Sequence, residues 1–280
     1  MQARTQGVLL AIVSAFGFST LAIFGRLATL AGMGLPSLLA FRFLLATPIV
    51  WGILVATGQA RPLSGRDLVI GLGLGGLGYA TMSYLFLFGV NLTGAGLGAI
   101  ILYIYPAIVV VMATVLLDER ITMLTVASVV LAVVGVALVA TGQPTRIDPL
   151  GIAILLFAAV AYATYITISR SILDRIEAPV LTAHVIPAAA VTFLVVSTVT
   201  GSFALPTGTE QWSVVIGIAI LATVLPILTF FYAVSMIGAS RASIVSTFEP
   251  VFTVVLGVAL LGETLTATSI VGGVAVLTGV

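Results

Sequence analysis

Glu249 is the residue most at odds with its surroundings, because it lies near the middle of the apolar run SIVSTFEPVFTVVLGVALLGE, Ser243–Glu263. Pro250 follows it, and a proline inside a helix lacks a backbone donor, which leaves a carbonyl near Ser246 without its usual partner. Three roles are open for this acid. It could support the bent helix in its protonated form, it could bind a proton or a substrate amine, or it could pair with an arginine.

Arg42 and His184 are the other ionisable side chains that lie well inside apolar stretches. A charge at the centre of a membrane helix costs about 2.5–3.5 kcal/mol, so such residues are candidates for charge or proton sites. Arg42 either extends outward to lipid headgroups or faces a cavity and attracts a carboxylate. His184, the single histidine, is either a neutral packing residue or a proton-sensitive gate and substrate contact.

Hydroxyl and phenol groups form a second set of candidates. Ser240, Ser243, Ser246 and Thr247 recur at three- and four-residue spacing, which places them on one helix face. An apolar cavity lined by aromatic rings with few polar groups suits an amphipathic small molecule. The alternative for each residue is helix packing with interhelical hydrogen bonds. The candidate substrate-binding residues are Tyr79, Ser83, Tyr103, Tyr162, Tyr165, Ser243, Ser246 and Thr247.

The elements that must position these residues follow from the composition of the 280 residues. The chain is 61% hydrophobic and 7% charged, with a mean hydropathy of +1.32, which is too little charge to cover a soluble domain. A membrane-spanning helix needs about 20 apolar residues, and ten such stretches occupy nearly the whole sequence. We therefore expect an all-α integral membrane protein of ten transmembrane helices, acting as a monomer among lipids, with neither cofactor nor nucleic acid.

An internal repeat divides the chain. Pro106 matches Pro250 and Glu119 matches Glu263, each pair 144 positions apart, and Gly94-Ala95 matches Gly238-Ala239 at the same offset. The repeat predicts five helices in residues 1–142, an outer connecting loop in residues 143–148 and five helices in residues 149–280. Because five is odd, the second set enters the membrane from the opposite side, an arrangement that places transporter sites near mid-membrane.

Arginine is the only basic residue type apart from His184, and its distribution predicts orientation. Seven arginines lie at one side of the predicted helices, against Arg26 and Arg146 at the other. By the positive-inside rule both termini are cytoplasmic. The first stretch lacks a small-residue cleavage site, so we expect it to be retained. The offset also predicts a last helix that reaches about position 286, beyond Val280.

Two further patterns have simpler explanations. GLGGLG, Gly73–Gly78, matches a nucleotide-binding fingerprint, but it lies inside an apolar stretch with no strand before it. Gly71, Gly75 and Gly78 are better explained as a close-packing helix face. There is no cysteine and no sequence pattern typical of a metal site or a catalytic nucleophile, so we expect no metal and no enzyme activity.

Two stretches carry a family resemblance. RASIVSTFEPVFTVVLGVALLGETLT, Arg241–Thr266, resembles the ninth helix of the ten-helix drug/metabolite transporter superfamily of EamA type, and YIYPAIVVVMATVLLDERIT, Tyr103–Thr122, resembles the fourth. The resemblance extends to YddG-type amino-acid exporters. It implies export of aromatic or other apolar amino acids across a bacterial inner membrane.

The expected function is therefore a secondary transporter that works by alternating access, with Pro106 and Pro250 as hinges. A multidrug or other metabolite exporter of the same superfamily is the nearest alternative. A phosphate-recognising carrier should show lysine or arginine at mid-membrane, and the absence of lysine from the chain counts against this alternative. A channel or membrane scaffold is the alternative from another class, and saturable uptake with counterflow would exclude it.

Overall fold

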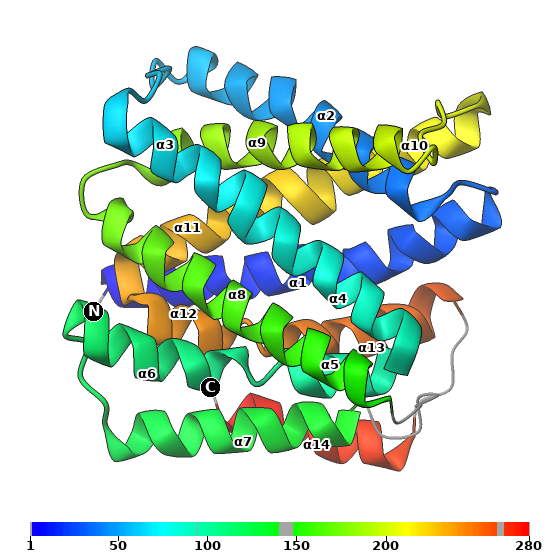
Figure 1. Ribbon diagram of the computed structural model, residues 1–280. Helices are drawn as coiled ribbons and strands as arrows, with labels where there is room; N and C mark the ends of the chain where they lie inside the picture. The colour runs from blue at the N-terminus through cyan, green and yellow to red at the C-terminus, as the bar shows by residue number, and fades with distance from the viewer. Residues whose placement is uncertain (1, 94, 140–147, 262–265, 280) are drawn as a thin grey trace.

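The computed structural model describes residues 2–93, 95–139, 148–261 and 266–279, in which every regular element is a helix (Figure 1). The first half consists of α1 Gln2–Leu30, α2 Leu35–Ala56, α3 Gly65–Gly73, η1 Leu74–Tyr79, α4 Ala80–Thr93, α5 Ala95–Leu102, α6 Tyr105–Leu117 and α7 Met123–Val139. The second consists of α8 Pro149–Leu173, α9 Ala178–Val199, α10 Gly208–Ala219, η2 Ile220–Val224, α11 Leu225–Ile237, α12 Ala239–Val245, α13 Phe248–Leu261 and α14 Ala267–Gly279.

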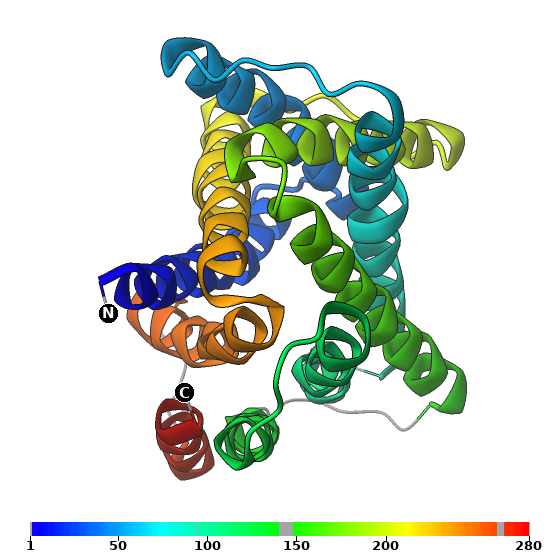
Figure 2. The same ribbon diagram turned by 90° about the vertical axis from the view of Figure 1, so that its left-hand side faces the viewer.

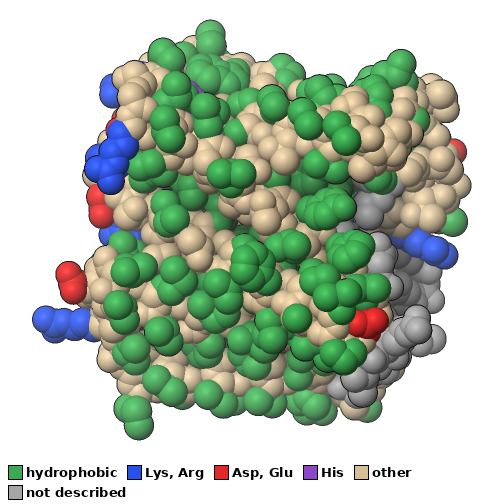
Figure 3. Space-filling view, viewed as in Figure 1, with side chains coloured by type: hydrophobic (Ala, Val, Ile, Leu, Met, Phe, Trp, Pro, Cys, Tyr) green, Lys and Arg blue, Asp and Glu red, His purple; other side chains and the backbone are tan. Residues whose placement is uncertain are grey.

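The helices form a membrane bundle. Eight described segments are long and apolar enough to cross a bilayer, and the shorter apolar helices α7 and α14 pack along each other. Large apolar side chains remain exposed on the sides of the bundle, where Leu77, Val115 and Met123 are 76%, 72% and 87% exposed. Figure 3 shows hydrophobic side chains across one such face and charged side chains at its left and right edges. This confirms the predicted all-α, multi-pass membrane fold.

The two halves repeat each other in detail at the offset of 144. The π-helical turn η1 recurs as η2, and both interrupt the third segment of their half. The fourth segment of each half contains a break, which lies between α5 and α6 in the first half and between α12 and α13 in the second. Pro106 and Pro250 lie in the first turn after each break, where a missing backbone donor is tolerated. The sequence-predicted repeat is thus confirmed as a structural one.

Helix pairs from the two repeats build the core. α1 packs on α11, α4 on α8, and α2 on α9, while α7 and α14 lie together at the bottom of Figure 2. Four parts of the sequence argument lie outside the described residues, namely Gly94, residues 143–147 (which include Arg146), Glu263 and Val280. The predicted connecting loop is therefore described only at Asp148, whose carboxylate accepts hydrogen bonds from the amides of Leu150 and Gly151 at the start of α8.

The glycine-rich run in α3 and η1 is a packing face, as the sequence indicated. A Cβ on Gly75 would come within 2.1 Å of the Val185 carbonyl on α9. A Cβ on Gly71 would meet His184, and one on Gly78 would meet Tyr165. Only glycine permits this approach of backbones, so the run serves helix packing and holds no nucleotide.

Candidate functional site

Five buried tyrosines form one connected cluster in the bundle. They come from η1 (Tyr79), from the break after α5 (Tyr103), from the first residue of α6 (Tyr105) and from α8 (Tyr162 and Tyr165). Ring centroids lie 4.6 Å apart for Tyr105 and Tyr162, 6.0 Å for Tyr162 and Tyr165, and 5.6 Å for Tyr165 and Tyr79. These spacings are typical of favourable aromatic contacts. The structure therefore brings together predicted residues that are far apart in the sequence.

Two of these phenols keep a hydroxyl group without a hydrogen bond to the described residues. Among the described residues, no enclosed side-chain nitrogen or oxygen lacks a hydrogen-bond partner. The Tyr162 and Tyr165 hydroxyls make no hydrogen bond to described residues, so each must retain contact with accessible space. The two residues are only 9% and 3% exposed, so their rings are almost wholly enclosed by neighbouring helices.

Arg42 lies on α2 and is 1% exposed. Its Nε donates to Thr223 Oγ1 at 2.6 Å, and its Nη2 donates to the Ala222 carbonyl at 2.7 Å and to the Tyr79 hydroxyl at 3.1 Å. Ala222 precedes Pro226 by four residues, and the missing N–H of that proline leaves the Ala222 carbonyl without a helical donor. Arg42 supplies the donor that Pro226 lacks.

The arrangement around Arg42 shows where its side chain points. Its burial excludes the role in which it extends to lipid headgroups, since the guanidinium turns inward toward η1 and η2. Tyr79 and Thr223, which both bond to it, are 144 positions apart and hold equivalent places in the two repeats. Nη1 makes no hydrogen bond to the described chain, so this nitrogen keeps accessible surface. It is available to an anionic ligand group.

Glu249 lies in the first turn of α13, where the helix dipole favours an acid. Its carboxyl group interacts with the Tyr103 hydroxyl and lies within electrostatic range of Arg42. The ion pairs of the described residues join other groups, so Glu249 is not held in a salt bridge. The Ser246 carbonyl already accepts from the backbone N–H of Glu249 at 3.0 Å, so the side chain is not needed there.

Ser243, Ser246 and Thr247 are buried, as the sequence predicted for an inward face. Each hydroxyl donates to a carbonyl three or four residues earlier in its own helix, at 2.9, 3.0 and 2.7 Å respectively. Such bonds bend helices, which fits their position at the break before Pro250. A ligand could therefore use these three groups only as acceptors, and their main part in the site is to shape the helix.

His184 on α9 connects three elements at the end of the bundle where α1 begins. Its Nε2 accepts from the backbone N–H of Leu63 at 3.1 Å, and its Nδ1 lies 2.8 Å from the Val180 carbonyl. This pattern defines the neutral tautomer with the proton on Nδ1. Trp51 packs edge-on against the imidazole at 5.3 Å. The geometry matches the packing alternative, with the loop between α2 and α3 as the group that His184 holds.

Ser83 lies on α4 one turn beyond Tyr79 and is half-buried, so it can reach the same space. Sequence reasoning missed Tyr105, Ala222 and Thr223. Tyr105 is 2% exposed and occupies the place in the first repeat that Glu249 occupies in the second. Thr223 is likewise the equivalent of Tyr79. Comparing the two repeats position by position would have identified both residues.

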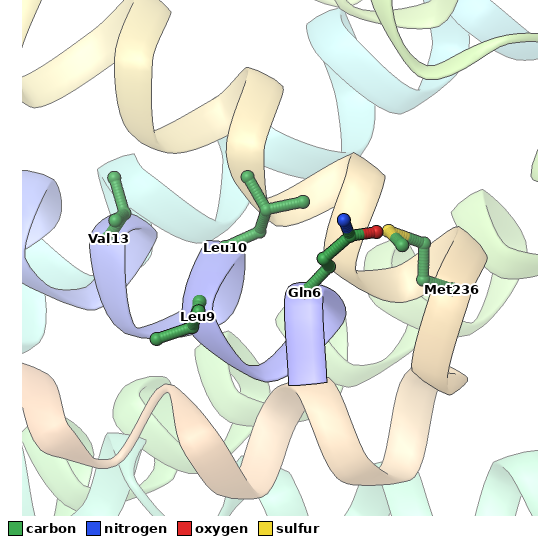
Figure 4. A pocket seen from close by; sticks show the side chains of 5 residues that line it. All are labelled: Gln6, Leu9, Leu10, Val13 and Met236. Atoms are coloured by element: carbon green, nitrogen blue, oxygen red, sulfur yellow. The ribbon is translucent and has the colours of Figure 1, made fainter. Parts of the chain in front are cut away.

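A surface hollow of about 380 Å³ lies elsewhere, between α1 and α11 (Figure 4). Its lining is Gln6, Leu9, Leu10, Val13 and Met236. Four of these five side chains are apolar, and Leu9 is 56% exposed on the side of the bundle. Such a surface suits contact with lipid tails, and it carries none of the tyrosine, arginine or acidic groups of the central cluster.

Comparison with known proteins shows which family the chain resembles. The sequence profile of the EamA-like transporter family matches residues 5–141 and residues 149–280. The threonine/homoserine exporter RhtA of Salmonella typhimurium strain LT2 is 29% identical over 257 residues, which cover 88% of this chain and 80% of that protein. The uncharacterized transporter YyaM of Bacillus subtilis strain 168 is 28% identical, over 86% of this chain and 81% of that protein.

A solved crystal structure superposes on 98% of this chain and 95% of its own length with a TM-score of 0.84 and 19% sequence identity, which shows a shared fold. The family profile covers both halves of the chain, in agreement with the structural repeat. The chain belongs to the EamA-like transporter family and is a multi-pass membrane transporter, not an enzyme.

Proposed function

We propose that this transporter exports small amphipathic amino acids, above all those with aromatic or other apolar side chains. The observation that carries the proposal is the free Nη1 of Arg42, a buried cation whose other contacts hold it in place. Glu249 lies within electrostatic range of it, on the other repeat. A zwitterionic amino acid complements such a pair, because its carboxylate matches the cation and its amine matches the acid.

The substrate carboxylate would bind to Arg42. Arginine recognises carboxylates well because its planar N–H groups match their geometry. Nε and Nη2 are engaged by Thr223, Ala222 and Tyr79, so the guanidinium is oriented before substrate arrives. This preorganisation reduces the ordering cost of binding.

The substrate amine would bind near Glu249, and its side chain would lie against the tyrosine cluster. Tyr162 and Tyr165 offer both ring faces and free hydroxyl groups. Aromatic faces also attract a nearby ammonium group, which supports the same orientation. The similarity to RhtA, a threonine/homoserine exporter, supports an amino-acid substrate.

Alternating access would then move the substrate outward. Repeats 1–142 and 149–280 would rock about the site, and the breaks before Pro106 and Pro250 would absorb the change in helix direction. We place both termini in the cytoplasm of a bacterium with the transporter in its inner membrane, because the arginines gather at the end of the bundle where α1 begins. No partner chain is required, so the proposal takes a monomer as the functional unit.

The test is uptake into proteoliposomes that contain the full chain. The substrates are phenylalanine and threonine, and the matched analogues are phenethylamine, which lacks the carboxylate, and 3-phenylpropionate, which lacks the amine. We expect saturable, counterflow-competent uptake of at least one amino acid. Each analogue should be transported about tenfold less efficiently or worse, because a lost hydrogen bond to a charged group costs about 1.5–3 kcal/mol. Absence of saturable amino-acid uptake under any gradient would refute the proposal.

A multidrug exporter is the second candidate, because Glu249 and the tyrosine faces alone would suit a lipophilic cation. The same liposomes distinguish it. Uptake of phenethylamine and cationic dyes without uptake of either amino acid would favour this candidate. Non-saturable flux of every solute would indicate a channel instead.

A further inference from the structure

The two ends of the bundle differ although the repeats are equivalent. We call the end where α1 begins, with Arg4, Glu119 and Arg241, the near end, and the opposite end, with Arg26 and Asp148, the far end. At the near end, α6 of the first repeat packs against α12 of the second (Figures 1 and 2). The equivalent far-end pair, α5 and α13, makes at most a marginal contact among the described residues.

Burial of equivalent residues shows the same asymmetry. Ser243 on α12 is 0% exposed, whereas its equivalent Ala99 on α5 is half-buried. Val109 on α6 is also 0% exposed, whereas its equivalent Thr253 on α13 is half-buried. Equivalent positions of the two repeats are therefore fully buried at the near end and only half-buried at the far end.

Other contacts of α11 and α12 also lack far-end equivalents. At the near end, α12 touches α7 of the first half, and within the second half both α12 and α11 pack against α8. The equivalents of the α12–α7 contact and of the α12–α8 and α11–α8 contacts would join α5 to α14, α5 to α1 and α4 to α1. None of these three pairs is closely packed within the described ranges.

Glu119 is the polar group that joins the repeats at the near end. It follows α6, and its Oε1 accepts from the Ala239 amide at 2.9 Å while its Oε2 accepts from the Ser240 amide at 3.2 Å. These amides begin α12, in the other repeat. Gly238 precedes them with a φ of +86°, and a Cβ there would lie 2.8 Å from Glu119 Oε1. Glycine thus allows both the backbone turn and the approach of the carboxylate.

Charge strengthens this contact. Hydrogen bonds from backbone amides to a carboxylate are stronger than those between neutral groups, and the positive end of a helix dipole adds to the attraction. The neighbouring acid Asp118 is exposed and makes no hydrogen bond from its side chain to the described residues. Glu119 is therefore the member of this acidic pair that binds across the repeats.

We propose that Glu119 is a latch that holds α6 of the first repeat on α12 of the second, and that the described conformation is closed at the near end and open at the far end. The latch is broken when the near end opens. This inference concerns conformation and does not depend on which substrate the transporter moves.

The chain has no cysteine, so single introduced cysteines can report on each end without background. The repeat-equivalent pair Ser243→Cys and Ala99→Cys is placed in the full chain in lipid nanodiscs and labelled with a hydrophilic maleimide. In the parent protein, Ala99→Cys should react much faster than Ser243→Cys. Adding Glu119→Gln should raise the rate at Ser243→Cys about tenfold, which corresponds to about 1.4 kcal/mol in a two-state equilibrium. The rate at Ala99→Cys should not rise.

The matched control is Asp118→Asn, which removes an adjacent acid at a position whose φ of 54° asparagine tolerates. It should leave both labelling rates within twofold of the parent. The proposal is overturned if Glu119→Gln leaves the Ser243→Cys rate unchanged, or if Asp118→Asn has the same effect. A rise at both cysteines would indicate general loosening of the bundle and would count equally against a latch.

Discussion

Replacing Thr223 by valine tests the site most directly, because it removes one hydroxyl and keeps the shape of the side chain. The Thr223 hydroxyl accepts from Arg42 Nε at 2.6 Å and donates to the Ile218 carbonyl at 2.8 Å. A hydrogen bond to a charged group contributes about 1.5–3 kcal/mol, and the buried guanidinium would lose one of its three protein bonds. We expect thermal unfolding in detergent to shift downward, and the KM for amino-acid uptake to rise about tenfold or more as Arg42 loses its orientation.

Thr229→Val is the matched control. Thr229 lies in the same membrane segment and is also buried, but its hydroxyl donates only to carbonyls of its own helix, at 2.8 and 3.3 Å. Its loss should cost about 0.5–1.5 kcal/mol and leave the KM within twofold of the parent. If Thr223→Val lowers stability no more than Thr229→Val and leaves the KM unchanged, Arg42 does not depend on Thr223 and our account of the site is wrong.

Three further predictions follow from particular contacts. Glu249→Gln should reduce amino-acid uptake about tenfold or more, because the substrate amine would lose its acidic partner; unchanged transport with lower thermal stability would instead assign the acid to helix shape. Gly75→Ala should destabilise the protein by about 1–3 kcal/mol, because the Cβ would meet the Val185 carbonyl, whereas Gly73→Ala, with open space around it, should not. His184→Phe should destabilise the protein by about 1–3 kcal/mol in a thermal melt, because the backbone N–H of Leu63 would lose its acceptor.

Composition and the repeat were sufficient to predict the architecture. Within a bilayer only helices and closed barrels satisfy the backbone, so apolar stretches of membrane length indicate helices. Pro106 and Pro250 lie 144 positions apart, and the helix breaks lie just before them because a proline constrains the backbone locally. These are properties of neighbouring residues, which is why reading the chain alone revealed them.

The sequence also indicated which side chains were unusual, but it left two or three roles open for Arg42, Glu249 and His184. The tertiary structure added their neighbours, which favour the inward-facing role for Arg42 and the packing role for His184, and it shows no salt bridge to Glu249 among the described residues. Packing of α2 against α10 and η2 brings Arg42 to the Ala222 carbonyl, and packing of α9 beside the loop after α2 brings His184 to Leu63.

The asymmetry between the two ends also came only from the structure. Residues at equivalent positions of the two repeats, such as Ser243 and Ala99, differ in burial. A local pattern specifies which face of a helix is apolar or hydroxyl-bearing. It does not specify which partner covers that face, because the partner lies more than a hundred residues away and the contact depends on how the two repeats are tilted against each other.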